Sequence, residues 1–370
     1  MLILTAFVVG SAHAAEVTDF PPAQRADIRV GYDYRHQFGS LEETWGGRQW
    51  GYGRRTETQH DLSPRIEFAI IQGVAINVTP DATLSRVYAF PSEGDIFCPQ
   101  GYGCDGPSRM MYDPVNQTGS YANGGVAVKL APEDIPRYAG KGLNGVWVGL
   151  AVQPFAERYS RNHLVTWRLD AAIRSANRHN SFWTAREDGT RGAAPGGAGF
   201  KLAAAFSTTN DTANPYLSAV YQREGKFVLD AYRDNDGTVW WTGQTLNPSD
   251  HFDVRGGVEL VAAENKTTES RFAVDMYFGF GYRSWEDIPS GILLPSVLDA
   301  SRSIVVTHYD HIIATGGLGL DTHFNKYAGF RLAFDASYLT PHPLEHVYPV
   351  RTDYDTVELG VHGSLDIKIR

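Results

Sequence analysis

Histidine and carboxylate side chains gather in two polar segments of the last quarter of the chain. His308, Asp310 and His311 lie in the first segment, and His342 and His346 lie in the second. Imidazole and carboxylate groups are ligands that suit zinc or copper. Their spacing matches no metal-binding motif, and histidine is common in polar loops. The sequence therefore assigns no metal ion and no cofactor to these residues.

The first of these segments also contains the residue types of a serine hydrolase. Ser303, His308 and Asp310 are neighbours in sequence. A nucleophile needs a base within hydrogen-bond reach and a third group that orients the base, and proximity in a loop supplies neither. No alternating segment places histidine and serine together on its apolar face, as an enzyme acting on membrane lipid would require. We therefore predict no catalytic residues and no enzymatic activity.

The two cysteines of the chain form a separate candidate. Cys98 and Cys104 enclose a stretch rich in glycine and proline that can turn tightly. A loop disulfide formed outside the cytoplasm is the interpretation we favour. A redox or metal pair is the alternative, but no second cysteine pair is present to complete a metal site.

A two-residue alternation is the strongest structural pattern in the sequence. Between Arg271 and Arg283, apolar residues such as Phe272 and Phe278 alternate with Arg271, Asp275 and other polar or small residues. Successive side chains of a strand point to opposite faces, so one face meets apolar surroundings and the other meets charge or water. The same alternation recurs in residues 27–35, 165–174, 253–261, 330–338 and 357–370. This repetition predicts an all-β fold, specifically a transmembrane antiparallel up-and-down β-barrel.

The polar faces of these segments carry acids and arginines that alternate in sign, so cross-strand neighbours can form ion pairs. They predict either an interior filled by salt bridges or an eyelet that sorts solutes by charge. We also expect Arg271 with Asp275, and Arg331 with Asp335, to project into this interior. The candidate lumen residues are Arg29, Asp33, Arg35, Arg65, Glu67, Arg168, Asp170, Arg174, Lys201, Asp253, Arg255, Glu259, Arg271, Asp275, Arg331, Asp335, Glu358 and Asp366.

Short polar turns and long connections alternate along the chain, as they do in bacterial barrels. Together they predict about twelve strands, within a range of ten to fourteen because the second long connection could hold an extra strand. The short turns are expected at Thr79–Ala82, Glu157–Asn162, Asn210–Asn214, Asn265–Ser270 and His323–Gly329. The long connections are expected at Gly39–Gln59, Pro91–Gly142, Ala176–Gly197, Glu224–Ser249, Ser284–Thr307 and Thr340–Asp355.

The first residues resemble an export signal. An apolar run from Leu2 to Val9 precedes Ser11–Ala14, which has small residues at the positions that signal peptidase reads. We expect a signal peptide at residues 1–14 and one barrel domain at residues 15–370. No later apolar stretch approaches the roughly 20 residues that a membrane helix requires.

Four stretches carry a family resemblance: Gly73–Pro91, Gly145–Leu150, Gly196–Ser207 followed by Pro215-Tyr216, and Thr340-Pro341-His342. In these the chain resembles the uncharacterised outer-membrane β-barrel proteins found in myxobacteria and related Gram-negative lineages. The resemblance implies a barrel fold and an outer-membrane location, and it implies no particular substrate.

These observations predict a passive outer-membrane channel for small polar solutes. Two alternatives remain open: a closed barrel whose loops bind polysaccharide or another cell, and an outer-membrane hydrolase. We expect contacts with outer-membrane lipid, lipopolysaccharide and the barrel-assembly machinery, while the oligomeric state stays open. The net charge of -9 argues against nucleic acid as a partner, because a binder needs a basic surface to displace counterions.

Overall fold

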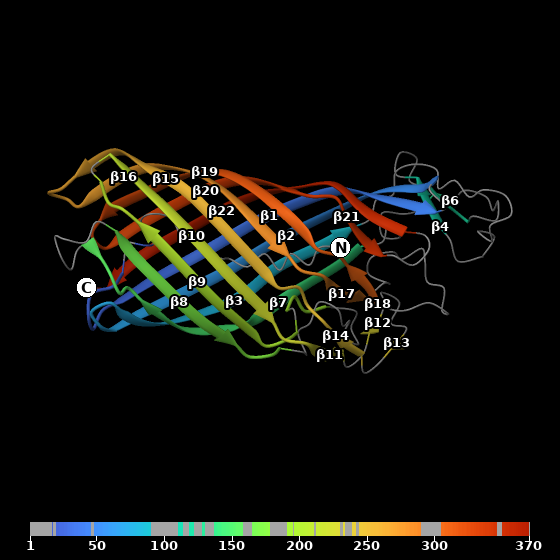
Figure 1. The fold of residues 1–370 in the computed structure, drawn as a ribbon, viewed down its shortest axis with the longest axis horizontal. Coiled ribbons are helices and arrows are strands. Elements are labelled where there is room, and N and C mark those ends of the chain that lie inside the picture. The colour runs from blue at the N-terminus through green and yellow to red at the C-terminus, as the bar shows by residue number, and fades with distance from the viewer. Residues whose placement is uncertain are drawn as a thin grey trace.

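A computed structural model describes Val17 and residues 20–45, 48–89, 110–113, 118–121, 128–129, 137–157, 165–177, 191–194, 196–210, 212–229, 232–233, 239–241, 244–289, 305–345 and 350–369. Its main sheet has 13 strands, of which β21 (His342–Glu345) pairs only with β22. The other twelve follow one another around the sheet, and β1 pairs with β22 to close it (Figure 1). The predicted antiparallel twelve-stranded barrel is confirmed.

The twelve wall strands are joined in up-and-down order, each antiparallel to its neighbours. They are β1 (Ala26–Trp45), β2 (Arg48–Ile71), β3 (Val74–Ala89), β7 (Arg137–Val152), β8 (Thr166–Arg174), β9 (Gly199–Ser207), β10 (Ala213–Glu224), β15 (His251–Asn265), β16 (Ser270–Arg283), β19 (His311–Asn325), β20 (Ala328–Leu339) and β22 (Val350–Ile369).

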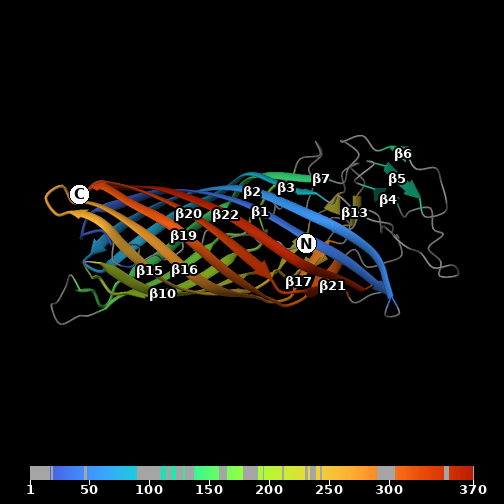
Figure 2. The ribbon, with the colours of Figure 1, turned by 90° about the horizontal axis from the view of Figure 1, so that it is seen from above.

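The two ends of the barrel differ. One end, called the short-turn end below, carries tight reversals such as residues 266–269 and 326–327, together with the C-terminus. The opposite end, called the loop end, carries all the remaining strands (Figure 2). These are β4 (Met110–Asp113), β5 (Thr118–Tyr121) and β6 (Val128–Lys129), β11 (Phe227–Leu229) paired with β14 (Gln244–Leu246), β12 (Tyr232–Arg233) paired with β13 (Val239–Trp241), β17 (Glu286–Pro289) paired with β18 (Val305–His308), and β21.

The wall has an apolar outer face and a polar inner face. On β16, Phe278 and Phe280 are 53% and 55% exposed, while Asp275 and Tyr277, which precede them on the strand, are buried. Ile173 on β8 and Leu318 on β19 are exposed in the same way. Because strand side chains alternate between faces, closure of the sheet sends every second residue into the interior. The alternation predicted from the sequence is confirmed on β8 and β16.

Two of the predicted connections are wrong. Thr79–Ala82 lies inside β3, and the chain reverses earlier, at Gln72 and Gly73, where Gly73 has a φ of 76°. Pro80 was misleading as a turn residue: it lies where the β2–β3 ladder is interrupted between Val78 and Ala82, a position that needs no N–H donor.

The segment Gly39–Gln59, expected to be a long loop, instead continues the first two strands. Both β1 and β2 extend toward the loop end, and their pairing runs to Trp45 opposite Arg48. Its glycine, tryptophan and charged residues resemble those of a loop. Composition alone therefore did not distinguish a loop from the end of a long hairpin.

Inward-facing tyrosines lie across glycines of the neighbouring strand to reach carboxylates one strand further. Tyr277 on β16 lies over Gly317 on β19, where a Cβ atom would come within 2.2 Å of the tyrosine ring, and donates to Asp335 on β20 over 3.1 Å. Tyr216 on β10 crosses Gly257 on β15 in the same way and donates to Asp275 on β16. These two tyrosine–carboxylate hydrogen bonds link β10 to β16 and β16 to β20 on the inner surface of the barrel.

Candidate functional site: the charged barrel interior

The charged residues expected to face the interior lie on wall strands, and every one of them is buried or half-buried. The largest group joins β2 to β8. Glu67 Oε2 accepts from Arg168 Nη2 over 2.5 Å and from Arg65 Nη2 over 2.7 Å. Asp170 accepts from Arg168 Nε over 2.9 Å and from Arg65 over 3.0 Å. The two arginines thus share two carboxylates, which neutralises all four charges.

A second group surrounds His362 on β22. Its Nδ1 lies 2.5 Å from Asp33 on β1, and its Nε2 lies 2.9 Å from Asp335 on β20. An imidazolium donates from both ring nitrogens, so this geometry suits the charged form of the ring. The alternation places His362 on the same polar face as Glu358 and Asp366, but the list of candidate lumen residues left it out.

Two arginines pair with carboxylates of the preceding strand. Arg331 binds Asp321 on β19 over 2.5 Å rather than Asp335 on its own strand, and Arg271 binds Glu259 on β15 rather than Asp275. Residues four apart on a strand are about 13 Å apart, because each residue advances about 3.3 Å. Register places Asp321 directly opposite Arg331, whereas Glu259 lies opposite Asp275, and Arg271 reaches Glu259 diagonally along the ladder.

The remaining candidate lumen residues also contact side chains of nearby strands. Arg29 pairs with Asp366 where β1 meets β22, and Arg283 Nη1 donates to Asp253 over 2.9 Å. The other contacts are Arg35 with Asp61 at 3.7 Å, Arg174 with Glu224 at 2.5 Å, Arg255 over the Tyr277 ring at 4.4 Å and Lys201 over the Trp147 ring at 5.2 Å. Glu358 is half-buried beside this set. Asp61, Glu224 and Asp321 were missed, because all three lie outside the segments in which alternation was recognised.

These bridges follow the wall rather than cross the barrel. The longest, from β2 to β8, joins strands three places apart in the order β2, β3, β7, β8. In a closed twelve-stranded sheet the opposite strand is six places away. These ion pairs therefore lie along the inner surface of the wall and do not join opposite sides of the barrel.

A cavity of about 110 Å³ lies inside the barrel near the short-turn end. It is lined from eight strands, β22, β1, β2, β3, β7, β8, β9 and β10, so it belongs to the lumen and not to one sector of the wall. Its charged lining residues are Asp27, Arg29, Arg65, Glu67, Arg168, Asp170, Lys201, Asp366 and Lys368. Five cations thus face four anions.

A segment preceding β1 reaches into the same end of the lumen. Phe20 is buried against the inward-facing Ala69, Ala75 and Ala151, and the Arg168 guanidinium lies 5.4 Å from its ring. Val17 is also buried, and its carbonyl accepts from Gln153 Nε2 over 2.8 Å. The short-turn mouth is therefore narrowed by residues that precede the barrel.

At the loop end, the structure brings together three of the histidines discussed above. His308, His311 and His342 are all buried, and their ring nitrogens lie within 4.8 Å of one another. The sequence analysis considered these three histidines among five possible ligands in two polar segments and assigned no metal ion to them, because their spacing matches no motif. The signal that would have found them is the pairing of β21 with β22, which the sequence pattern did not reveal.

Several predictions lie outside the described residues. They are the Cys98–Cys104 disulfide, the signal peptide at residues 1–14, Ser303 and His346. Among the described residues, no helix is long and apolar enough to cross a membrane.

No family model and no curated protein matches this sequence. Among solved structures, the chain is similar to a FadL homologue from Pseudomonas aeruginosa, with a TM-score of 0.40, 8% identity and coverage of 96% of this chain and 94% of that one. It is also similar to the β domain of the Bordetella autotransporter Brka, with a TM-score of 0.38, 10% identity and coverage of 92% and 100%. The outer membrane protease OmpT from Escherichia coli gives a TM-score of 0.34, 7% identity and coverage of 94% and 97%.

Proposed function

We propose that this protein is an outer-membrane β-barrel of a Gram-negative bacterium and that its interior is a narrow passage for small polar solutes. The membrane location is supported by the inverted polarity of the wall. Large apolar side chains such as Phe278 and Leu318 lie outside, and buried arginines and carboxylates lie inside. Only a closed barrel can present this arrangement to lipid, because all its backbone groups are paired within the sheet.

The observation that most supports an open lumen is the position of the ion pairs along the wall. The ion pairs described for Arg65, Glu67, Arg168 and Asp170 join strands no more than three places apart in the twelve-stranded wall, which favours a lined channel over a spanned one. Twelve strands enclose a wider interior than eight, which side chains just fill, and a narrower one than the sixteen of a porin. The cavity has space for several water molecules, which suits small solutes.

Both signs of charge line the cavity, so we expect weak discrimination between ions and ready passage of small neutral polar molecules. The proposed role is passive and includes no catalytic step. Its partners are outer-membrane lipid, lipopolysaccharide and the barrel-assembly machinery.

A closed barrel is the second candidate, and the segment that contains Val17 and Phe20 favours it. These residues narrow the short-turn mouth, and a barrel sealed there would act through its loop end, as a surface that binds polysaccharide or another cell.

Liposome swelling separates the two candidates. Protein refolded into liposomes should admit small sugars at a rate that falls steeply with sugar size, and empty liposomes serve as the control. A sealed barrel gives no swelling with any sugar, although it still migrates differently on gels before and after boiling.

A further inference from the structure

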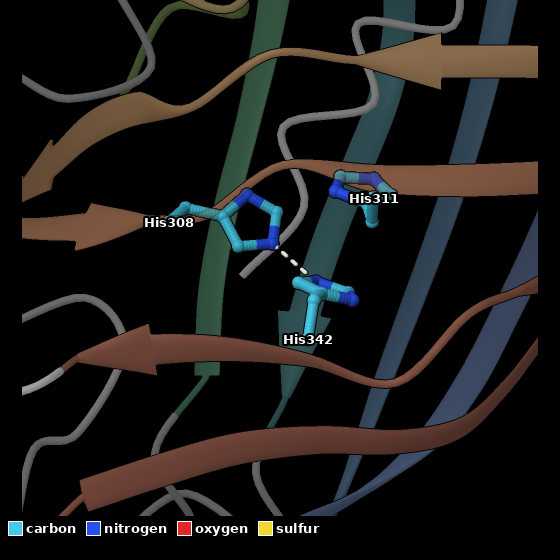
Figure 3. Close-up of side chains that lie close together, drawn as sticks. All are labelled: His308, His311 and His342. Carbon is cyan, nitrogen blue, oxygen red and sulfur yellow. Dashed lines mark hydrogen bonds between the residues drawn. The ribbon is translucent and has the colours of Figure 1, made fainter.

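The loop end holds a cluster of side chains that the proposed passage does not use. His308 ends β18, His311 begins β19 and His342 begins β21, so three separate strands contribute one imidazole each (Figure 3). All three are buried. The hydrogen bond from the Tyr309 amide to the Pro343 carbonyl, 3.0 Å long, holds the segments side by side.

The hydrogen bonds around the cluster fix which nitrogen of each ring carries the proton. Nδ1 of His342 lies 2.6 Å from the Thr340 carbonyl, and Nδ1 of His311 lies 3.2 Å from the Tyr309 carbonyl. A carbonyl oxygen only accepts, so each Nδ1 is the donor. Nδ1 of His308 faces the buried carboxylate of Glu286 at 3.0 Å, which is likewise an acceptor. In the neutral rings, every Nε2 therefore presents a lone pair.

Two of these lone pairs point at each other. Nε2 of His308 lies 2.6 Å from Nε2 of His342, as the dashed line in Figure 3 shows. Two unprotonated nitrogens repel at this distance, so a positive charge, either a shared proton or a metal ion, lies between or beside them. The ring of His311 stacks on that of His342, with centroids 4.1 Å apart, and one ring nitrogen from each of the three histidines lies within 4.8 Å of the others.

We propose that His308, His311 and His342 bind a divalent transition-metal ion, with zinc the ion that suits the set best. Three imidazoles are a common zinc ligand set, and zinc favours four ligands in tetrahedral geometry. Asp353, which pairs with His342 across β21 and β22, supplies the fourth: its Oδ2 lies 3.8 Å from His342 Nε2. The carboxylates of Glu286 and Asp353 carry two negative charges, which a divalent ion balances.

The surroundings of the histidines are those of a metal site. Metal-ligating histidines almost always donate their other N–H to a carboxylate or a carbonyl, and all three do so here. The neighbouring cation, Arg283, pairs with Asp253 at 2.9 Å, which offsets its charge near His311. Three histidines and a carboxylate fill the zinc coordination, so the site is structural: it fastens the β17–β18 hairpin and β21 to the barrel rim.

Zinc binding to the refolded full-length chain tests the proposal. After dialysis against zinc and then against a weak chelator, the protein should retain one zinc ion per chain by elemental analysis. Cobalt in its place should give the visible absorption of a tetrahedral site. His308→Ala and His342→Ala should each lose the bound metal, and His60→Ala, which alters a histidine bonded to Tyr32 on the wall, should keep it.

Folding is checked by migration on gels before and after boiling. Glu286→Gln keeps the ligands and the shape, and it should weaken zinc binding by about 10- to 100-fold because the orienting carboxylate is lost. Retention of less than one zinc ion per folded parent chain would show that the histidine pair shares a proton instead, which overturns the proposal. Equal retention by the parent and by a folded His308→Ala variant also overturns it.

Discussion

The bridge between β2 and β8 makes a measurable contribution to stability. Arg168 donates to Glu67 over 2.5 Å and to Asp170 over 2.9 Å, and Glu67 is only 5% exposed. Replacing Arg168 by methionine keeps the volume and removes the charge. Breaking a buried ion pair costs about 3–5 kcal/mol, because the remaining carboxylate loses its positive partner while it stays mostly buried. Arg65 still contacts both carboxylates, so we expect the lower end, about 3 kcal/mol.

The free energy of unfolding in urea, measured in lipid vesicles by tryptophan fluorescence, reports this cost. Arg223→Met is the matched control, since Arg223 is exposed and lies 3.8 Å from Asp250, and it should cost less than about 1 kcal/mol. The double variant with Glu67→Met should lose less than the sum of the two single variants. A cost below about 1 kcal/mol for Arg168→Met, or full additivity, would refute the bridge as a stabilising contact.

Three further outcomes follow. Phe278→Arg on the outer face should lower the free energy of unfolding by roughly 2–4 kcal/mol if that residue lies near the bilayer midplane. Phe252→Arg, near the loop end, should lower it by about 1 kcal/mol or less. Similar costs for the two variants would contradict the membrane assignment. Gly317→Val should destabilise by about 1–3 kcal/mol by striking the tyrosine ring that crosses it, whereas the neighbouring Gly316→Val has open space. Phe20→Ala should increase the conductance of single channels by widening the short-turn mouth, and an unchanged conductance would place the constriction elsewhere.

The fold could be predicted from the sequence because the side-chain period of a strand is two. From Arg271 to Arg283 the apolar and polar residues alternate without a break, and the structure buries and exposes them accordingly. Turns were harder to place, because Pro80 and its neighbours have turn composition but lie in β3. Strand ends depend on pairing with a distant partner, which composition does not encode.

The sequence predicted which charged side chains face the interior but not which of them form pairs. The inward charges of β1, β2, β8, β15, β16, β20 and β22 follow from the alternation. Their partners do not, because register and the reach of each arginine decide them: Arg331 binds Asp321, and Arg65 reaches β8 across two strands. His308 and His342 meet only because β21 folds back on β22, a contact between segments with no periodic signature.

Single-channel recording in planar bilayers tests the central claim most directly. The purified barrel should produce discrete conductance steps with weak ion selectivity, because the lumen carries charges of both signs. Arg168→Glu should shift the reversal potential toward cation preference, since fixed charge in a narrow passage is poorly screened. A correctly folded and inserted barrel that gives no steps, in either the parent or the Phe20→Ala form, would contradict the account of an open polar passage.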